Sequence, residues 1–177
     1  MKDSASVRVS EAPLIDHGRI TERIPELADA ISRDLARREP ILLIVLKGGL
    51  FVGAELASRM TVPVRLEFVC ARSYQGTTSS GAVTLGELPV FAGRDVVVVE
   101  DILDTGRTLA ALLARLRAHG PASIRVCTLL DKPARREVDV EADYVGFTIA
   151  DEFVVGYGLD YEERYRTLPS IHVLERD

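Results

Sequence analysis

The sequence is poor in cysteine and lacks both a long apolar stretch and an excess of basic residues. Its 177 residues include two cysteines, Cys70 and Cys127, and neither has a second cysteine or a histidine at metal-ligand spacing. We therefore expect two buried free thiols. The longest unbroken apolar run, Ile41 to Leu46, is far shorter than the roughly 20 residues of a spanning helix, so we expect no membrane association.

The charge balance is slightly acidic. The chain has 22 Lys and Arg against 27 Asp and Glu, a net charge of −5. This disfavours nucleic-acid binding, because neutralising phosphates requires a basic surface. Anionic small molecules stay open as ligands, since clustered backbone N–H groups bind phosphate whatever the net charge. The first 13 residues contain no apolar segment typical of a secretory signal, so we expect a cytoplasmic protein.

The order of the expected elements indicates an α/β fold. Apolar residues recur every three or four positions from about Asp16 to Arg38, which predicts a helix that either starts near Thr21 or is kinked at Pro25. Because strands and helices alternate after it, we expect one domain over residues 1–177, with a mainly parallel sheet and ligands at the carboxyl ends of its strands. The other expected elements are strands at Ile41–Leu46, Val62–Cys70, Val96–Val99 and Ile124–Leu130, shorter strands at 144–147, 153–155 and 171–174, and helices up to about Met60 and His119.

The segment after the four valines carries a phosphate-binding pattern. The sequence Asp-Thr-Gly-Arg-Thr at 104–108 leads from the strand into a helix. Gly106 permits a backbone turn that a larger residue would resist. The N–H groups of this turn and the hydroxyls of Thr105 and Thr108 can bind a phosphate at the positive end of the helix dipole.

Two adjacent acids precede this turn. Glu100 and Asp101 follow the valines directly, at the expected carboxyl edge of the sheet. Such a pair can hold either ribose hydroxyls or a hydrated Mg²⁺. Asp104 lies between the acid pair and the phosphate-binding turn, which places it within reach of both sites.

The run from 96 to 108 resembles the phosphoribosyl-pyrophosphate signature of the type I phosphoribosyltransferases. Other segments follow the order of the hypoxanthine-guanine phosphoribosyltransferase family, and the resemblance covers about residues 10–177. It implies the type I fold, a mainly parallel sheet flanked by helices, with a small hood formed by N- and C-terminal segments. The matching segments are Leu46–Gly49, the Ser73-Tyr74 loop, Leu130–Pro133, Tyr144–Phe147 and Phe153–Tyr161.

The resemblance also implies a reaction. It is the transfer of the 5-phosphoribosyl group of phosphoribosyl pyrophosphate to hypoxanthine and/or guanine in purine salvage, with Mg²⁺ as cofactor, in a homo-oligomer (dimer or tetramer). Enzymes for adenine or orotate usually have lysines in their flexible loop, and residues 73–81 contain none. A preference for xanthine stays open, as does a nucleotide-sensing regulator with the same fold.

Individual roles come from the same resemblance. Asp104 matches the acid that handles the purine proton, and the family's Leu-Lys peptide, here Leu46-Lys47, is often cis. The implied catalytic residues are Asp104, Lys47 and Arg166. The implied binding residues are Glu100, Asp101, Asp104, Thr105, Gly106, Arg107 and Thr108 for ribose and 5-phosphate, Lys47, Gly48 and Arg166 for pyrophosphate, Lys132, Phe153 and Val154 for the base, Ser73 and Tyr74 in a closing loop, and Glu100, Asp101 and Asp160 for the metal.

Three segments stand outside this pattern. Pro25 is unusual in the first helix, and the connection 86–91 is more apolar than expected. Arg135 and Arg136 are followed by Glu137 and Asp139, which is typical of a mixed, solvated face.

Overall fold

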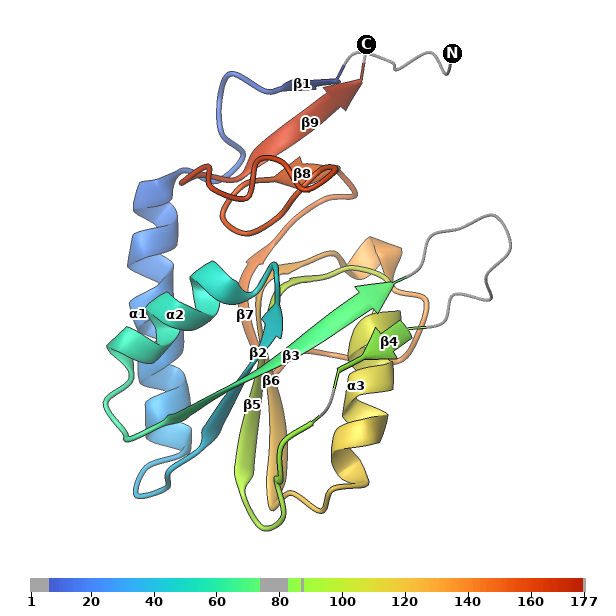
Figure 1. The fold of residues 1–177 in the computed structure, drawn as a ribbon. Coiled ribbons are helices and arrows are strands. Elements are labelled where there is room, and N and C mark those ends of the chain that lie inside the picture. The colour runs from blue at the N-terminus through green and yellow to red at the C-terminus, as the bar shows by residue number, and fades with distance from the viewer. Residues whose placement is uncertain (1–6, 74–82, 87, 177) are drawn as a thin grey trace.

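A computed structural model describes residues 7–73, 83–86 and 88–176 (Figure 1). Its central sheet has six strands in the order β4-β3-β2-β5-β6-β7. All neighbouring strands are parallel except β4, which runs antiparallel to β3. The predicted α/β fold with a mainly parallel sheet is therefore confirmed. The strands are β2 (Ile41–Leu46), β3 (Arg65–Ser73), β4 (Val83–Leu85), β5 (Asp95–Leu103), β6 (Ser123–Asp131) and β7 (Tyr144–Thr148).

Helices cover both faces of this sheet. Helices α1 (His17–Asp34) and α2 (Leu50–Arg59) lie on one face, and α3 (Arg107–Arg117) lies on the other (Figure 1). Alternate valines of β5 point to opposite sides, so Val97 and Val99 pack with α1 and α2 while Val96 and Val98 pack with α3. An unbroken apolar run is what a strand buried on both faces requires.

A second, antiparallel sheet forms the predicted hood. It joins β1 (Val7–Val9), β9 (His172–Arg176) and β8 (Val154–Val155) in the order β1-β9-β8. The N-terminal and C-terminal strands of the described chain thus lie side by side (Figure 1). The short 3₁₀ helix η1 (Pro133–Arg135) follows β6.

Several boundaries differ from the predicted ones. Helix α1 begins at His17, capped by the Asp16 carboxylate, which accepts a hydrogen bond from the Arg19 N–H at 3.0 Å. Pro25 lies inside the helix, so the expected start near Thr21 is wrong. Strand β3 begins later than predicted and ends at Ser73, whose backbone pairs with Val83, so Ser73 is part of a strand and not of the loop.

The apolar connection before β5 is explained by one anchor. Phe91 is fully buried in the core on the α3 side of the sheet, whereas neighbouring Val90 is 82% exposed. No helix within the described ranges is long and apolar enough to cross a membrane.

One face of β3 is left uncovered. Leu66 and Phe68 are 44% and 46% exposed, and Cys70, on the same face, is also exposed. Helix α2 packs mainly on β2 and β5, the strands nearer the centre of the sheet. The expectation that both cysteines are buried is therefore wrong for Cys70 and confirmed for Cys127.

Candidate active site

A cleft of about 550 Å³ opens at the carboxyl ends of β2 and β5. It brings together the segments after β2, the end of β5 with the turn into α3, and two residues that precede β9. The predicted residues that line it are Lys47, Gly48, Glu100, Asp101, Asp104, Thr105, Gly106, Arg107, Thr108, Asp160 and Arg166.

The acid pair lies within β5, because this strand continues to Leu103. Glu100 is 8% exposed, and burial together with the neighbouring Asp101 raises its pKa well above the ordinary value. Burial also raises the pKa of Asp101 to about 6, although backbone N–H groups and Arg166 oppose that rise. The two carboxylates are therefore costly to ionise, and a bound cation or hydroxyl donor would offset this cost.

The loop after β2 packs directly on this acid pair. A Cβ atom on Gly48 would lie 1.7 Å from Oδ2 of Asp101, so only glycine leaves the carboxylate in place. The preceding Leu46-Lys47 peptide is cis. The close contact at Gly48 means that the position of the loop and that of the Asp101 carboxylate depend on each other.

The basic side chains predicted to bind pyrophosphate share one carboxylate. Oε2 of Glu163 lies 2.9 Å from Nζ of Lys47 and 3.4 Å from Nη2 of Arg166. Arg166 also pairs with Asp160 at 2.8 Å and donates to the carbonyl of Gly158. Its buried Nε finds no acceptor among the residues that the structure describes. The hydrogen bond from Lys47 and the charge of Arg166 lower the pKa of Glu163. Glu163 also has a positive φ of 63°, which is uncommon for a residue other than glycine.

The phosphate-binding turn begins helix α3. Gly106 has a φ of +83° and immediately precedes the first helical residue, Arg107. A Cβ atom at Gly106 would lie 2.5 Å from Val140, so both the conformation and the packing require glycine. The free N–H groups at the start of α3 make this end of the cleft suitable for an anion.

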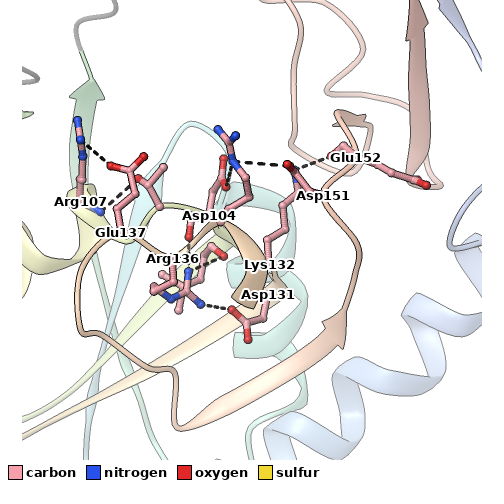
Figure 2. Close-up of polar contacts among 11 residues, drawn as sticks. Asp104, Arg107, Asp131, Lys132, Arg136, Glu137, Asp151 and Glu152 are labelled. Atoms are coloured by element: carbon pink, nitrogen blue, oxygen red, sulfur yellow. Dashed lines mark hydrogen bonds and ion pairs between the residues drawn. The ribbon is translucent and has the colours of Figure 1, made fainter.

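The residues predicted to bind the base lie beside the cleft and not in its lining. Lys132 is 6% exposed and donates from Nζ to the carbonyl of Glu152 at 2.5 Å (Figure 2). Phe153 is 47% exposed and meets Tyr161 edge to face with ring centroids 5.8 Å apart, whereas Val154 is buried. Leu103 and Asp131 pair at the ends of β5 and β6, which places Lys132 next to Asp104 along the sheet edge.

Only the first residue of the predicted closing loop lies within the described residues. The backbone of Ser73 belongs to β3, and Tyr74 lies outside the described residues. Its role stays a prediction.

The sequence prediction missed the basic segment after β6. Arg135 lines the cleft, and its Nε lies 3.4 Å from Asp104 and 3.6 Å from Asp151 (Figure 2). Glu137 also lines the cleft and pairs with Arg107 at 2.5 Å, while the side chain of Arg136 is only 18% exposed. The expected mixed, solvated face is therefore wrong for Arg136, whereas Arg135, Glu137 and Asp139 are exposed as expected. The available signal was position, since this segment follows the carboxyl end of a strand that neighbours β5.

Known proteins resemble the chain over most of its length. The phosphoribosyl transferase domain family matches residues 13–162. A hypoxanthine-guanine phosphoribosyltransferase of Streptococcus pneumoniae is 44% identical over 167 residues, which are 93% of each chain. A structure of a hypoxanthine-guanine phosphoribosyltransferase from Bacillus anthracis has a TM-score of 0.88 and 40% identity, covering 96% of this chain and 99% of that one.

A further solved structure has a similar fold. A hypoxanthine phosphoribosyl transferase of Trypanosoma cruzi has a TM-score of 0.86 at 36% identity and covers 95% of this chain and 93% of that chain. The fold, the signature at 96–108 and the cleft agree with these similarities. The chain belongs to the phosphoribosyl transferase family and, within it, to the group of the hypoxanthine-guanine phosphoribosyltransferases.

Proposed function

We propose that the chain transfers the 5-phosphoribosyl group of phosphoribosyl pyrophosphate to hypoxanthine and/or guanine and releases pyrophosphate. The observation that carries the proposal is the cleft itself. It places an acid pair between an anion-binding turn and two adjacent basic side chains, which suits a ribose with a phosphate at one end and a diphosphate at the other. The relatives' names supply the purine bases.

In this proposal, the turn at 104–108 binds the 5-phosphate, and Glu100 and Asp101 accept hydrogen bonds from the ribose hydroxyls. Lys47 and Arg166 face the diphosphate. Negative charge grows on the diphosphate as its bond to the ribose breaks, so positive side chains at that point stabilise the transition state more than the ground state.

Mg²⁺ is part of the proposal. Within the described residues, no group of three His, Cys, Asp or Glu side chains is placed to hold a metal without other ligands. This agrees with the way Mg²⁺ usually binds, through one or two carboxylates together with water and substrate phosphates. Glu100, Asp101 and Asp160 are the side chains that would hold it, and when bound it neutralises the diphosphate. The raised pKa values of the acid pair fit a site that a cation completes.

The base-binding part of the proposal rests on Lys132 and Asp104. A lysine ammonium only donates hydrogen bonds and a purine 6-oxygen only accepts them, so the two match. Asp104 then takes the proton that the imidazole ring of the base loses as the new carbon–nitrogen bond forms. Phe153 stacks on the base, and the backbone of Val154 contacts its edge.

The test measures kcat/KM for hypoxanthine, guanine, xanthine and adenine with phosphoribosyl pyrophosphate and Mg²⁺. Hypoxanthine or guanine should be used and adenine refused, because a 6-amino group offers the Lys132 ammonium no acceptor and directs its own donors at it. Discrimination of about 10⁴ is typical of sites built around such a polar contact. Lys132→Met should reduce activity on 6-oxopurines and narrow their advantage over adenine. Efficient use of adenine by the unmodified protein would refute the assignment.

Further parts of the proposal concern the assembly and the setting. We propose that residues 1–177 form one phosphoribosyltransferase domain that acts in the cytoplasm, where its two free thiols suit a reducing environment. We also propose a homo-oligomer, dimer or tetramer, because Leu66 and Phe68 expose apolar surface on β3. Sedimentation of the wild type and of Phe68→Glu tests this, and a monomeric wild type would contradict it.

A further inference from the structure

A layer of residues lies behind the phosphate-binding turn. Arg136 lines a separate cavity of about 350 Å³, together with Asp131, Asp139 and Val140, and does not line the substrate cleft. Arg135, the preceding residue, points the other way and reaches the Asp104 carboxylate. Arg135 thus lines the substrate cleft and Arg136 the separate cavity, and Figure 2 shows Arg136 beside Asp131 and the backbone of the turn.

Arg136 holds backbone atoms of the turn and not its side chains. Its Nη1 donates to the carbonyl of Leu103 at 3.0 Å and to the carbonyl of Asp104. Its Nη2 pairs with the carboxylate of Asp131, which is as well shielded as Arg136 itself, with side-chain exposures of 17% and 18%. A planar guanidinium can make all these contacts at once, which the single ammonium of a lysine does with much poorer geometry.

The next carbonyl along the turn is held from the same segment. The N–H of Glu137 donates to the carbonyl of Thr105 at 3.0 Å. Residues 136 and 137 thus bind three consecutive carbonyl oxygens, those of Leu103, Asp104 and Thr105. Gly106 packs on the same side, where a Cβ atom would lie 3.2 Å from Cδ of Arg136.

The geometry of the peptide bond links these contacts with the carbonyls to the direction of the N–H groups in the same turn. In a trans peptide the carbonyl and the following N–H point in opposite directions. The N–H groups of Asp104 and Thr105 therefore point away from Arg136, and the N–H of Gly106 points away from the N–H of Glu137. Among the residues that the structure describes, none of these three N–H groups has a protein acceptor.

We propose that Arg136 is a positioning residue that turns the N–H groups of Asp104 and Thr105 toward the cleft and thereby sets its affinity for the 5-phosphate. The inference deepens the proposed function and rests on it. Arg136 contacts no substrate in this proposal and acts only through the backbone of the turn. Replacement of Arg136 should weaken the binding of ligands that carry a 5-phosphate and leave the binding of ligands that lack one nearly unchanged.

The experiment compares a nucleoside with its monophosphate. Calorimetry gives the Kd of inosine and of inosine monophosphate. The Kd of inosine divided by the Kd of the monophosphate measures how much the 5-phosphate strengthens binding. In Arg136→Lys, we expect this ratio to fall about tenfold or more, because charge-assisted hydrogen bonds to a phosphate depend on donor alignment. The Kd of inosine should change less than about twofold. Arg136→Ala should regain part of the ratio when methylguanidinium is added.

Arg125→Lys is the matched control. Arg125 is a partly buried arginine that pairs with Asp34 at 2.8 Å and with the Tyr144 hydroxyl at 2.9 Å, and it does not line the cleft. This variant should lose stability and keep the wild-type ratio. If Arg136→Lys fails to fold, Asp131→Asn tests the same hold, since it removes the charge that fixes Arg136 and should lower the ratio by a smaller factor.

Two results would overturn the inference. One is an unchanged ratio in folded Arg136→Lys, and the other is an equal loss of affinity for inosine and its monophosphate, which would mark a general structural role. Failure of the proposed function is distinguishable, because in that case the wild type itself would bind the monophosphate no more tightly than inosine.

Discussion

Replacing Asp101 by asparagine is expected to stabilise the fold while removing activity. Burial raises the pKa of this carboxyl from 3.8 to about 6, so the folded protein holds its ionised form at a cost. A difference of about two pKa units corresponds to about 3 kcal/mol, at 1.36 kcal/mol for each unit. Asparagine has the same shape and no charge, so it escapes this cost. For a chain of this size, the gain corresponds to a rise in Tm of roughly 6–12 °C.

The pH dependence of the gain follows from the two pKa values. Well below pH 4 both folded and unfolded wild-type chains are protonated at Asp101, and the variant has no advantage. As the pH rises through the range between 4 and 6, the unfolded chain ionises first and the folded wild type loses stability. Above this range the cost is complete, so the difference between the proteins should be largest at pH 7 and above.

Urea denaturation of both proteins at pH 4, 5.5 and 7.5 measures this difference. Asp29→Asn is the control, because Asp29 is exposed on α1 and its replacement should change stability by less than about 0.5 kcal/mol. Turnover measured in parallel should be lost in Asp101→Asn alone. A variant that is no more stable than the wild type at pH 7.5, or a difference that does not vary with pH, would refute the reasoning.

The remaining predictions address other parts of the cleft. Asp104→Asn keeps the shape of the base but cannot take a proton, so kcat should fall by at least about 10²-fold with little change in phosphoribosyl pyrophosphate binding; near-normal turnover would remove Asp104 from this role. Glu163→Gln removes the carboxylate shared by both basic side chains of the pyrophosphate site, so calorimetry should show tighter binding of pyrophosphate, and weaker binding would contradict this competition. Gly48→Ala should displace the adjacent carboxylate and weaken phosphoribosyl pyrophosphate binding with an unchanged circular dichroism spectrum, whereas unchanged affinity would show that the loop has room to adjust. Proteolysis within 73–81 should slow when phosphoribosyl pyrophosphate and a base analogue are bound, and equal cleavage rates would argue against a closing loop.

The sequence predicted well those parts of the fold whose structure depends on residues within one short segment. The run Val96–Val99 is apolar at every position, and only a strand covered on both faces requires this. The turn at 104–108 depends on its own glycine and on the helix that it starts. Both the strand and the turn could therefore be predicted without knowledge of the rest of the chain.

The parts that sequence predicted poorly depend on partners distant in the chain. Cys70 was expected to be buried because its segment is apolar, but whether Leu66, Phe68 and Cys70 are covered depends on what packs on this face of β3. Arg136 has the composition of a surface residue, and its burial depends on the carbonyls of a turn about thirty residues earlier. Pro25 is tolerated because tertiary packing of the apolar face of α1 outweighs one missing hydrogen bond.

The pairing of β1 with β9 in the hood has a consequence for the order in which the site is assembled during synthesis. Domains generally fold as the chain emerges from its N-terminus, and β9 follows every strand of the central sheet. A nascent chain that extends through β7 already contains the acid pair, Asp104 and the anion-binding turn. It lacks Arg166 and the strand that ties the hood to β1. The ribose-phosphate residues Glu100, Asp101 and 104–108 are therefore all present while the pyrophosphate site still lacks Arg166.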